Sequence, residues 1–557
     1  MNRIAFFFIV FLLIFNCAYS QSTQDFSNRK IDGITGKVGN NIGAGYAIAI
    51  IRNNTVIFKK GYGKANLEYN IPISTQSVFD AASLAKQFTG FAISTLIQQG
   101  RIKLSDDISK YLPQVPNFGA PITIENLVHH TSGIRDWPEA LQAAGWRYDE
   151  LCSFEDILNM VKNQKDLDFE PGNSFSYSNT GYNLLAAIVE KVSGQTFPKW
   201  TQENIFKPLN MTSSRFLNDK SFIIHNEAYP YSPDQQGGFL KLQNVLTAYG
   251  SSSLYTNIDD LCKWVIHLQN GISLNEPVYK LMLEVGVLKN GNNTNYGFGL
   301  EIGQYQNLQT ISHTGAWSGY RSMIKIYPDK KLAYVLLSNG NDDHLISSTQ
   351  KVLDDFFMPQ TNIVANAKSL NQQKLKRINP ILLSKYAGKY KWGPGEINIT
   401  IEDGQLYIQY TGEDKYPTEA LSDSSFLWTV AGLPITFSKP IGNQSQSFYF
   451  KSIQGKRFVP FSPTLQQLND YSGTYSSNEL FTKYTIDQVN GKLFVHHFRR
   501  GDFELYPDTT DTFSSDIGTL SFIKNNIGHV TAFMLSGNKV KNLKFNKDIG
   551  IESVNGH

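Results

Sequence analysis

A serine and a lysine three residues apart, Ser83 and Lys86, could supply a nucleophile and its activating base. A serine hydroxyl attacks a carbonyl poorly until a base removes its proton, and lysine can do so only if burial or a nearby cation lowers its pKa. Ser83 opens a strongly patterned helix, so its hydroxyl lies at the positive end of the helix dipole with Lys86 on the same face. The bare S-x-x-K pattern discriminates nothing, because it also begins at five other serines: Ser27, Ser322, Ser348, Ser521 and Ser536.

Two further motifs carry polar groups suited to the same chemistry. In Tyr177-Ser178-Asn179, the tyrosine could accept or relay a proton and Asn179 could donate its amide to a substrate carbonyl. His313-Thr314-Gly315 is the only H-x-G in the chain and ends a predicted strand. A glycine there lets a substrate backbone lie close, and the next amide, that of Ala316, points toward the same space.

The elements that must position these motifs follow from sequence periodicity. Strands are expected at 46–52 and 55–62 around the turn dipeptide Asn53-Asn54. Helices are expected at 83–99, 153–165, 180–192 and 256–269, with glycines 100, 194 and 271 as C-terminal caps. A period of two then predicts an antiparallel meander at 295–302, 308–313, 319–327 and 332–337. Together they predict one α+β domain over 33–357, in which the N-terminal hairpin joins the late meander in a single sheet.

A repeat organises the C-terminal part of the chain. The segment 383–390, with Tyr386-Ala387-Gly388-Lys389-Tyr390, returns as 468–475, with Tyr471-Ser472-Gly473-Thr474-Tyr475. After a linker at 358–380, we therefore expect two all-β units at 381–463 and 464–549, each a small lipocalin-like barrel. One larger barrel built from both copies is the alternative.

The N-terminus predicts export. Arg3 precedes an apolar run and the small-residue site Ala18-Tyr19-Ser20, so residues 1–20 resemble a cleaved signal peptide, and the mature protein would be secreted or periplasmic. The apolar run is too short to cross a bilayer. Lipid anchoring through Cys17 fits less well, because Asn16 stands where a small residue should precede the cysteine. Cleavage leaves Cys152 and Cys262, which could pair but lack metal-ligand spacing.

Composition excludes one large class of functions. Lys+Arg number 51 and Asp+Glu 48, a net charge of only +3 over 557 residues, so the basic excess of a nucleic-acid binder is missing. Aromatic residues make up 13% of the chain, which excludes a disordered protein.

Other polar residues have structural interpretations. We expect His129 and His130 to pack and hydrogen-bond in the loop closed by 131–133. Residues 135–137 are expected to form a surface turn, with a place at the border of the active site as the alternative. His496 and His497 should point to opposite faces of a strand, which disfavours a shared metal site. Neither a metal nor a cofactor is expected.

The ordered motifs at Ser83, Tyr177 and His313 resemble the serine β-lactamase and penicillin-binding-protein superfamily. The similar branch contains class C β-lactamases, D-aminopeptidases and related esterases. Segment 127–134 matches its "L-x-H-T-S-G" phrase, and segment 296–299 its "Y-G-x-G" strand. The resemblance covers roughly 33–357 and implies a β-lactamase/DD-peptidase-like antiparallel sheet flanked by helices.

The resemblance also implies roles for the motif residues. Ser83 would be acylated, Lys86 and Tyr177 would handle protons, with the base left open between them, and Asn179 would bind the substrate amide. The stretch from His313 through Thr314 and Gly315 to Ala316 would line the site. The backbone N–H groups of Ser83 and Ala316 would form the oxyanion hole.

One departure from the family pattern changes the expected substrate. Relatives that act on β-lactams or cell-wall peptides usually carry lysine where His313 stands, and a histidine with a pKa near 6.5 anchors a carboxylate weakly. We therefore expect an exported serine hydrolase acting on a small-molecule or peptide substrate, through an amide bond, including one of a D-amino acid, or an ester bond. The alternatives are a penicillin-binding carboxypeptidase or β-lactamase and, from another class, a non-catalytic binding protein.

Overall fold

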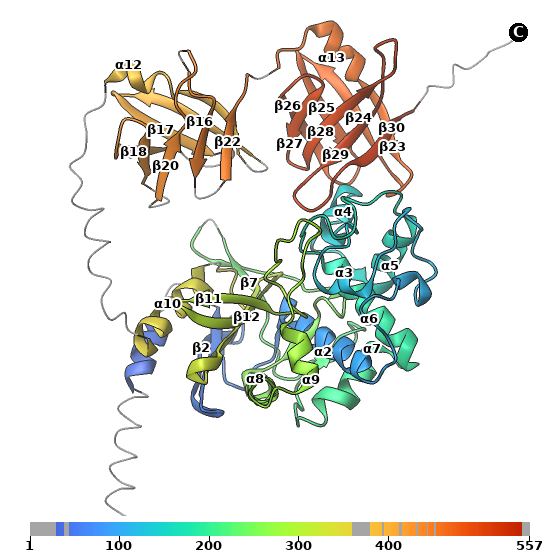
Figure 1. Cartoon of the computed structure of the whole chain (residues 1–557), viewed down its shortest axis with the longest axis vertical. Coiled ribbons are helices and arrows are strands. Elements are labelled where there is room, and N and C mark those ends of the chain that lie inside the picture. Colours follow the sequence, from blue (N-terminus) through green and yellow to red (C-terminus); the bar gives the residue numbers. More distant parts are fainter. Residues whose placement is uncertain are drawn as a thin grey trace, which may run out of the picture. The chain divides into compact units, whose positions relative to one another are not determined.

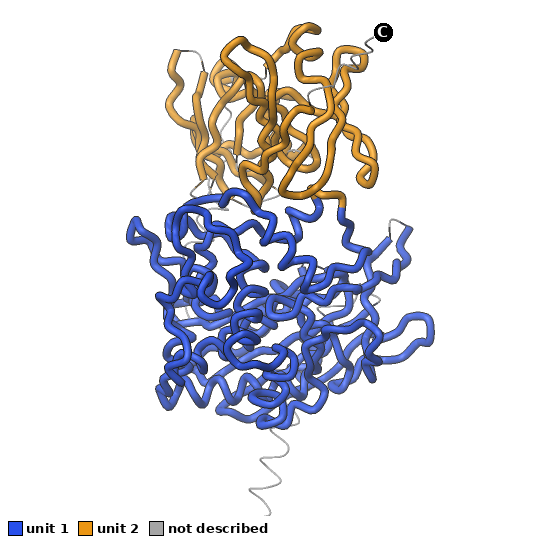
Figure 2. Tube along the Cα trace, turned by 90° about the vertical axis from the view of Figure 1, so that its right-hand side faces the viewer, with its two compact units in different colours: residues 1–142, 146–359 blue, residues 143–145, 360–557 orange. Residues whose placement is uncertain are grey.

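The computed structural model describes residues 29–37, 44–234, 236–342, 344–358, 379–392, 395–410, 415–429, 433–442, 444–450, 453–459 and 461–548 (Figure 1). The chain divides into two compact units, residues 1–142 with 146–359 and residues 143–145 with 360–557 (Figure 2). The expected leader and nearly all of the expected linker lie outside the described residues. No described helix is both long enough and apolar enough to cross a membrane.

A seven-stranded antiparallel sheet forms the framework of the first unit, in the order β11-β12-β13-β14-β1-β2-β3. Strand β1 pairs with β14 through Tyr46 and Ser338, so the predicted union of the hairpin with the late meander is confirmed. Asn53 and Asn54 turn the hairpin with φ of 51° and 60°. The strands are β1 (Gly45–Arg52), β2 (Thr55–Asn66), β3 (Ile71–Pro72), β11 (Glu301–Tyr305), β12 (Leu308–Trp317), β13 (Tyr320–Tyr327) and β14 (Leu332–Ser338).

The strand predicted at 295–302 is wrong over most of its length, because β11 begins only at Glu301. The preceding residues form a loop that packs on the helices. Phe298 donates its N–H to the Met282 carbonyl at 3.0 Å, and a Cβ on Gly299 would lie 2.4 Å from the Lys86 carbonyl carbon. The glycines of this segment therefore serve close packing rather than strand pairing.

Helices and short strands complete the first unit. The helices are α2 (Ala85–Gln98), α3 (Ile124–Val128), α4 (Trp137–Ala143), α5 (Phe154–Asn163), α6 (Asn179–Ser193), α7 (Phe197–Thr201), α8 (Ile258–Ser273), α9 (Pro277–Leu283) and α10 (His344–Phe357). The short strands are β4 (Phe79–Asp80), β5 (Cys152–Ser153), β6 (Arg215–Phe216), β7 (Tyr231–Pro233), β8 (Phe239–Lys241), β9 (Leu246–Thr247) and β10 (Leu254–Thr256). A 3-10 turn (Ala82–Leu84) leads into α2.

The predicted end of one helix is wrong. We expected Gly271 to cap the helix that begins near residue 256, but α8 continues to Ser273. A Cβ at Gly271 would lie 2.1 Å from the Tyr279 ring, so this glycine makes room for α9. Gly194 does cap α6, with φ of 73°.

The two faces of the sheet are covered differently. On one face Tyr46, Ile48 and Ile50 pack with α10 and with the helix at 29–37. On the other face α8 contacts β1 and β14, where Ala47 and Ala49 are fully buried. The alternation along β1 thus buries both faces, because each has a helical cover.

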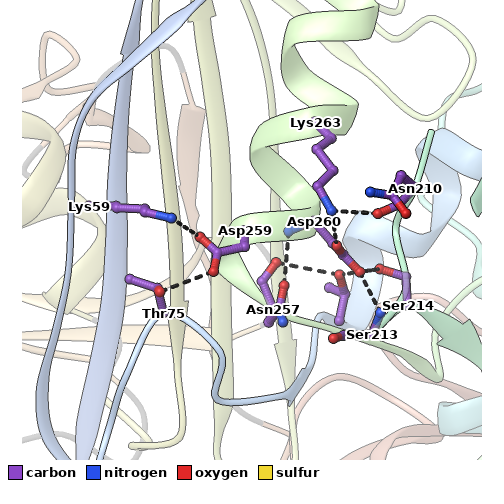
Figure 3. Close-up of polar contacts among 10 residues, drawn as sticks. Lys59, Thr75, Asn210, Ser213, Ser214, Asn257, Asp259, Asp260 and Lys263 are labelled. Carbon is purple, nitrogen blue, oxygen red and sulfur yellow. Dashed lines mark hydrogen bonds and ion pairs between the residues drawn. The ribbon is translucent and has the colours of Figure 1, made fainter.

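Polar contacts fix the start of α8 (Figure 3). Asn257 caps the helix by accepting the N–H of Asp260 at 2.9 Å. The buried Asp260 carboxylate accepts the N–H of Ser213 at 2.8 Å. Asp259 pairs with Lys59 of β2 at 2.5 Å. The helix is therefore tied both to the sheet and to the loop before β6.

The second unit contains two closed barrels of eight strands each, as the repeat predicted, and the single larger barrel is excluded. The first comprises β15 (Gly388–Trp392), β16 (Gly395–Glu402), β17 (Gln405–Tyr410), β18 (Lys415–Ala420), β19 (Ser425–Trp428), β20 (Leu433–Phe437), β21 (Ser447–Phe450) and β22 (Ile453–Arg457), preceded by α12 (Pro380–Leu383). The second comprises β23 (Gly473–Ser477), β24 (Thr482–Val489), β25 (Lys492–His497), β26 (Gly501–Pro507), β27 (Thr512–Ser515), β28 (Gly518–Lys524), β29 (Val530–Ser536) and β30 (Leu543–Lys547), preceded by α13 (Leu465–Tyr471).

The repeated motif closes each barrel in the same way. The Tyr390 hydroxyl donates to the Tyr386 carbonyl at 2.8 Å, and Tyr475 donates to Tyr471 at 2.7 Å. A basic side chain from the last strand covers each of these rings, as with Arg457 at 4.7 Å from the Tyr390 centroid. The motif thus joins the first strand of each barrel to the helical segment that precedes it.

Candidate active site

Ser83 lies in a strained turn just before α2. Ala82 has φ of 48°, a left-handed conformation that costs a non-glycine residue about 1 kcal/mol. The buried Asp80 carboxylate holds this turn by accepting the Ala82 N–H at 2.8 Å. Ser83 itself stays half-buried and so retains access to solvent.

Lys86 is fully buried one turn further along. Its Nζ donates to Ser83 Oγ at 3.1 Å, to Asn179 Oδ1 at 2.8 Å and to the Ser251 carbonyl at 2.9 Å. The Tyr177 ring centroid lies 4.8 Å from the same nitrogen. The S-x-x-K and Y-x-N motifs therefore meet at Ser83, although 93 residues separate Lys86 from Asn179.

Tyr177 completes the polar contacts of the Ser83 hydroxyl. Burial raises the pKa of Tyr177 well above its usual 10, while a side-chain hydrogen bond with Ser83 acts in the opposite direction. The phenol is therefore protonated near neutral pH. Its ring packs against the His130 ring at a centroid distance of 4.4 Å, and this contact holds the phenol in place.

His313 is a neutral imidazole in a buried position. Its Nδ1 lies 2.6 Å from the Thr314 carbonyl, which can only accept, and its Nε2 lies 2.9 Å from the Tyr296 hydroxyl. Nδ1 therefore carries the proton and Nε2 accepts from Tyr296. Burial, aided by the positive charge of Lys86, lowers the pKa of His313 from 6.5 to about 3.

Strand β12 brings the third motif against the turn that contains Ser83. A Cβ on Gly315 would lie 2.5 Å from the Ala81 carbonyl oxygen and 3.0 Å from the Ser83 nitrogen, so only glycine fits. The strand lies inside the sheet, between β11 and β13. Within the described residues, however, β11 pairs with β12 only as far as Ser312. From His313 onward, β12 is therefore not paired with β11.

Asn179 begins α6 and is held by a buried carboxylate. Asp136 Oδ1 accepts the main-chain N–H of Asn179 at 2.7 Å, and Oδ2 accepts its side-chain amide at 3.2 Å. The predicted surface turn at 135–137 is wrong, since Arg135, Asp136 and Trp137 are all at most 2% exposed. The Arg135 ion pair with buried Asp168 lets the segment enter the interior.

The two adjacent histidines support the loop beneath the site, as predicted. His129 donates from Nδ1 to the Tyr296 carbonyl at 2.9 Å, and burial lowers its pKa to about 4. His130 Nδ1 accepts the N–H of Ser178 at 3.1 Å. Each histidine thus contacts one tyrosine motif: His129 bonds the Y-G-x-G segment and His130 bonds the Y-x-N segment.

The remaining candidates lie elsewhere. His496 and His497 do face opposite sides of β25: His496 pairs with Asp502 at 2.9 Å, and His497 is buried against Thr482. Cys152 and Cys262 are buried free thiols. Across the described ranges, no group of three or more His, Cys, Asp or Glu side chains is arranged to hold a metal ion.

The family of the first unit follows from comparison with known proteins. The model of the Beta-lactamase family matches residues 36–352, more than half of the chain. The chain therefore belongs to the β-lactamase family of serine hydrolases, together with penicillin-binding proteins and D-aminopeptidases.

Individual relatives support this assignment. A penicillin-binding protein of Bacillus subtilis (strain 168) is 26% identical over 69% of this chain and 87% of its own length. A D-aminopeptidase of Gluconobacter oxydans is 25% identical over 55% of this chain and 58% of its own. The octameric penicillin-binding protein homologue from Pyrococcus abyssi shares the fold, with a TM-score of 0.56 and 20% identity over 85% of this chain and 98% of that one.

Proposed function

We propose that the protein is a serine hydrolase that forms an acyl-enzyme on Ser83 from an amide or ester substrate. The observation that carries the proposal is the pair of contacts at one hydroxyl: Ser83 Oγ meets Lys86 Nζ at 3.1 Å and hydrogen-bonds Tyr177. A nucleophile with two proton carriers in hydrogen-bond reach is the arrangement that acyl transfer needs.

The proposed first step forms the Ser83 Oγ–carbonyl bond. The serine proton passes to Lys86 once that amine is neutral, and a proton passes to the leaving nitrogen or oxygen as its bond to the carbonyl breaks. Tyr177 suits the second transfer, because a phenol with a raised pKa is protonated and can donate. Water then attacks the acyl-enzyme by the same steps in reverse roles, which releases the acid and restores Ser83.

The oxyanion would be held by the main-chain N–H groups of Ser83 and Ala316. Gly315 lies against the Ser83 nitrogen, which brings the neighbouring Ala316 close to it. Trp317 and Tyr320 form the last pair of the β12–β13 hairpin, and Ala316 belongs to the pair before it. Hydrogen-bonded and non-hydrogen-bonded pairs alternate in an antiparallel ladder, so the Ala316 N–H points away from β13. One such donor contributes about 3 to 4 kcal/mol of transition-state stabilisation.

The proposed substrate class rests on the charge of the side chain at position 313. His313 is neutral and buried, so it gives no fixed cation for a substrate carboxylate. This favours peptide amides, including those of D-amino acids, and esters over β-lactams. The Gluconobacter D-aminopeptidase relative supports an amide substrate. The Bacillus relative favours a second candidate, a penicillin-binding carboxypeptidase or β-lactamase, which labelled penicillin would identify by acylating Ser83.

We also propose that the enzyme acts outside the cytoplasm, on the evidence of the predicted leader at 1–20. Edman sequencing of the protein recovered from the periplasm or medium should begin at Gln21. A chain that keeps its first twenty residues inside the cell would contradict export.

A fluorophosphonate probe tests the proposed nucleophile. Wild-type protein should be labelled and Ser83→Ala should not. Ser521→Ala is the matched control, because Ser521 also begins an S-x-x-K pattern but lies in β28 of the second barrel, and it should be labelled like wild type. Equal labelling of wild type and Ser83→Ala would refute the assignment.

A further inference from the structure

Asp136 is buried at the start of α6 and uses both carboxylate oxygens on one residue. Oδ1 accepts the main-chain N–H of Asn179 at 2.7 Å, and Oδ2 accepts its side-chain NH2 at 3.2 Å. Asn179 is the first residue of α6, so its N–H has no acceptor within the helix, and the positive end of the helix favours a carboxylate there.

The Asn179 amide is bound from both sides in a defined orientation. Its Oδ1 accepts from the Lys86 ammonium at 2.8 Å while its NH2 faces Asp136. A half-turn of the amide would place its NH2 against the Lys86 donor and its carbonyl oxygen against the carboxylate acceptor, which would lose both hydrogen bonds. The carboxylate and the ammonium thus select one of two amide orientations.

Neighbouring contacts keep the carboxylate in place. The Trp137 N–H donates to Thr180 Oγ1 at 2.8 Å, and the same hydroxyl donates to the Arg135 carbonyl at 2.7 Å. These bonds join the residues on both sides of Asp136 to the residue that follows Asn179. The two segments are therefore joined on both sides of Asp136.

We infer that Asp136 is a positioning residue, which fixes the Asn179 amide and thereby the place of Lys86 beside Ser83. The inference rests on the proposed function, since it assigns Asp136 to the activation of Ser83. The line of contacts runs from Asp136 through Asn179 and Lys86 to the nucleophile. Both of these carboxylate hydrogen bonds go to Asn179.

A double-mutant cycle on the rate of Ser83 labelling by a fluorophosphonate tests the inference without knowledge of the natural substrate. In Asp136→Asn, the new amide must turn its own NH2 toward a donor, so the Asn179 amide loses its partner or turns. We expect labelling to slow about tenfold in Asp136→Asn and at least as much in Asn179→Ala. The double variant should be no slower than Asn179→Ala if Asp136 positions Lys86 through Asn179.

Two further variants separate positioning from folding. Asp260→Asn changes another buried carboxylate, one in α8 that accepts the Ser213 N–H and the Ser214 hydroxyl; it should lower the melting temperature and leave the labelling rate unchanged. Asp136→Glu keeps the charge and should be labelled faster than Asp136→Asn. If Asp136→Asn does not fold, Asp136→Glu takes its place in the cycle.

Each outcome of the cycle decides something. The positioning role would be overturned if the double variant were slowed by the product of the two single-variant factors, or if Asp136→Asn were labelled at the wild-type rate. A wild-type protein that the probe does not label would instead refute the proposed function.

Discussion

The stability of the first unit should depend on pH through His313, whose pKa falls from 6.5 to about 3 on burial. A histidine with a lowered folded-state pKa contributes stability that is complete above pH 6.5 and is lost as the pH falls toward 3, because the unfolded chain then binds the extra proton. At pH 5.0 the unfolded imidazole is almost fully protonated and the folded one almost fully neutral. The free energy of unfolding should therefore fall by about 2 kcal/mol between pH 7.5 and pH 5.0, because about 1.5 pH units separate pH 5.0 from the unfolded-state pKa of 6.5.

The variant His313→Gln isolates this contribution. Glutamine can still accept from Tyr296 and donate to the Thr314 carbonyl, but it does not titrate. Urea unfolding followed by tryptophan fluorescence, at pH 7.5 and at pH 5.0, should show that wild type loses about 2 kcal/mol more than the variant. His129, with a pKa of about 4, contributes in the same direction to both proteins and cancels in the difference.

An equal loss in wild type and variant would refute the reasoning. It would mean that His313 is as easily protonated in the folded protein as in the unfolded one. His313 would then be a cation that could hold a substrate carboxylate at mildly acidic pH.

Three other substitutions have definite expected results. Lys86→Met should slow fluorophosphonate labelling of Ser83 by about 100-fold or more, since it removes a general base or its partner while keeping the side-chain volume; a near-normal rate would exclude Lys86 from the proton transfer. Gly315→Ala should abolish ester hydrolysis, because its Cβ would lie 2.5 Å from the Ala81 carbonyl oxygen, and full activity would show that β12 does not lie so close. Asn53→Val, at φ of 51°, should destabilise the first unit by about 1 to 2 kcal/mol in urea unfolding, and an unchanged midpoint would contradict the left-handed turn.

Local patterns predicted much of the fold. The Asn53-Asn54 hairpin, α2 and the two barrels follow from short-range signals, because turn chemistry, helical period and an internal repeat are all written within a few residues. The failures arose where glycines serve tertiary packing. Gly271 was expected to end a helix and instead makes room for Tyr279.

The motif residues of the site were found from the sequence, but their partners were not. Ser251 offers only a carbonyl to Lys86, which no side-chain pattern can reveal. An Arg-Asp pair is normally solvated, so the sequence around Asp136 does not indicate its burial. Its burial depends on Asp168 neutralising Arg135 and on the helix end at Asn179, and those contacts are visible only in three dimensions.

The central claim is that catalysis passes through an acyl group on Ser83. The direct measurement is mass spectrometry of acid-quenched protein during turnover of a panel of p-nitrophenyl esters and p-nitroanilides, D-amino-acid substrates included. The account predicts that the peptide containing Ser83 gains the mass of the acyl group and that Ser83→Ala gains none. Turnover with an adduct on another residue, or turnover that persists in Ser83→Ala, would contradict it.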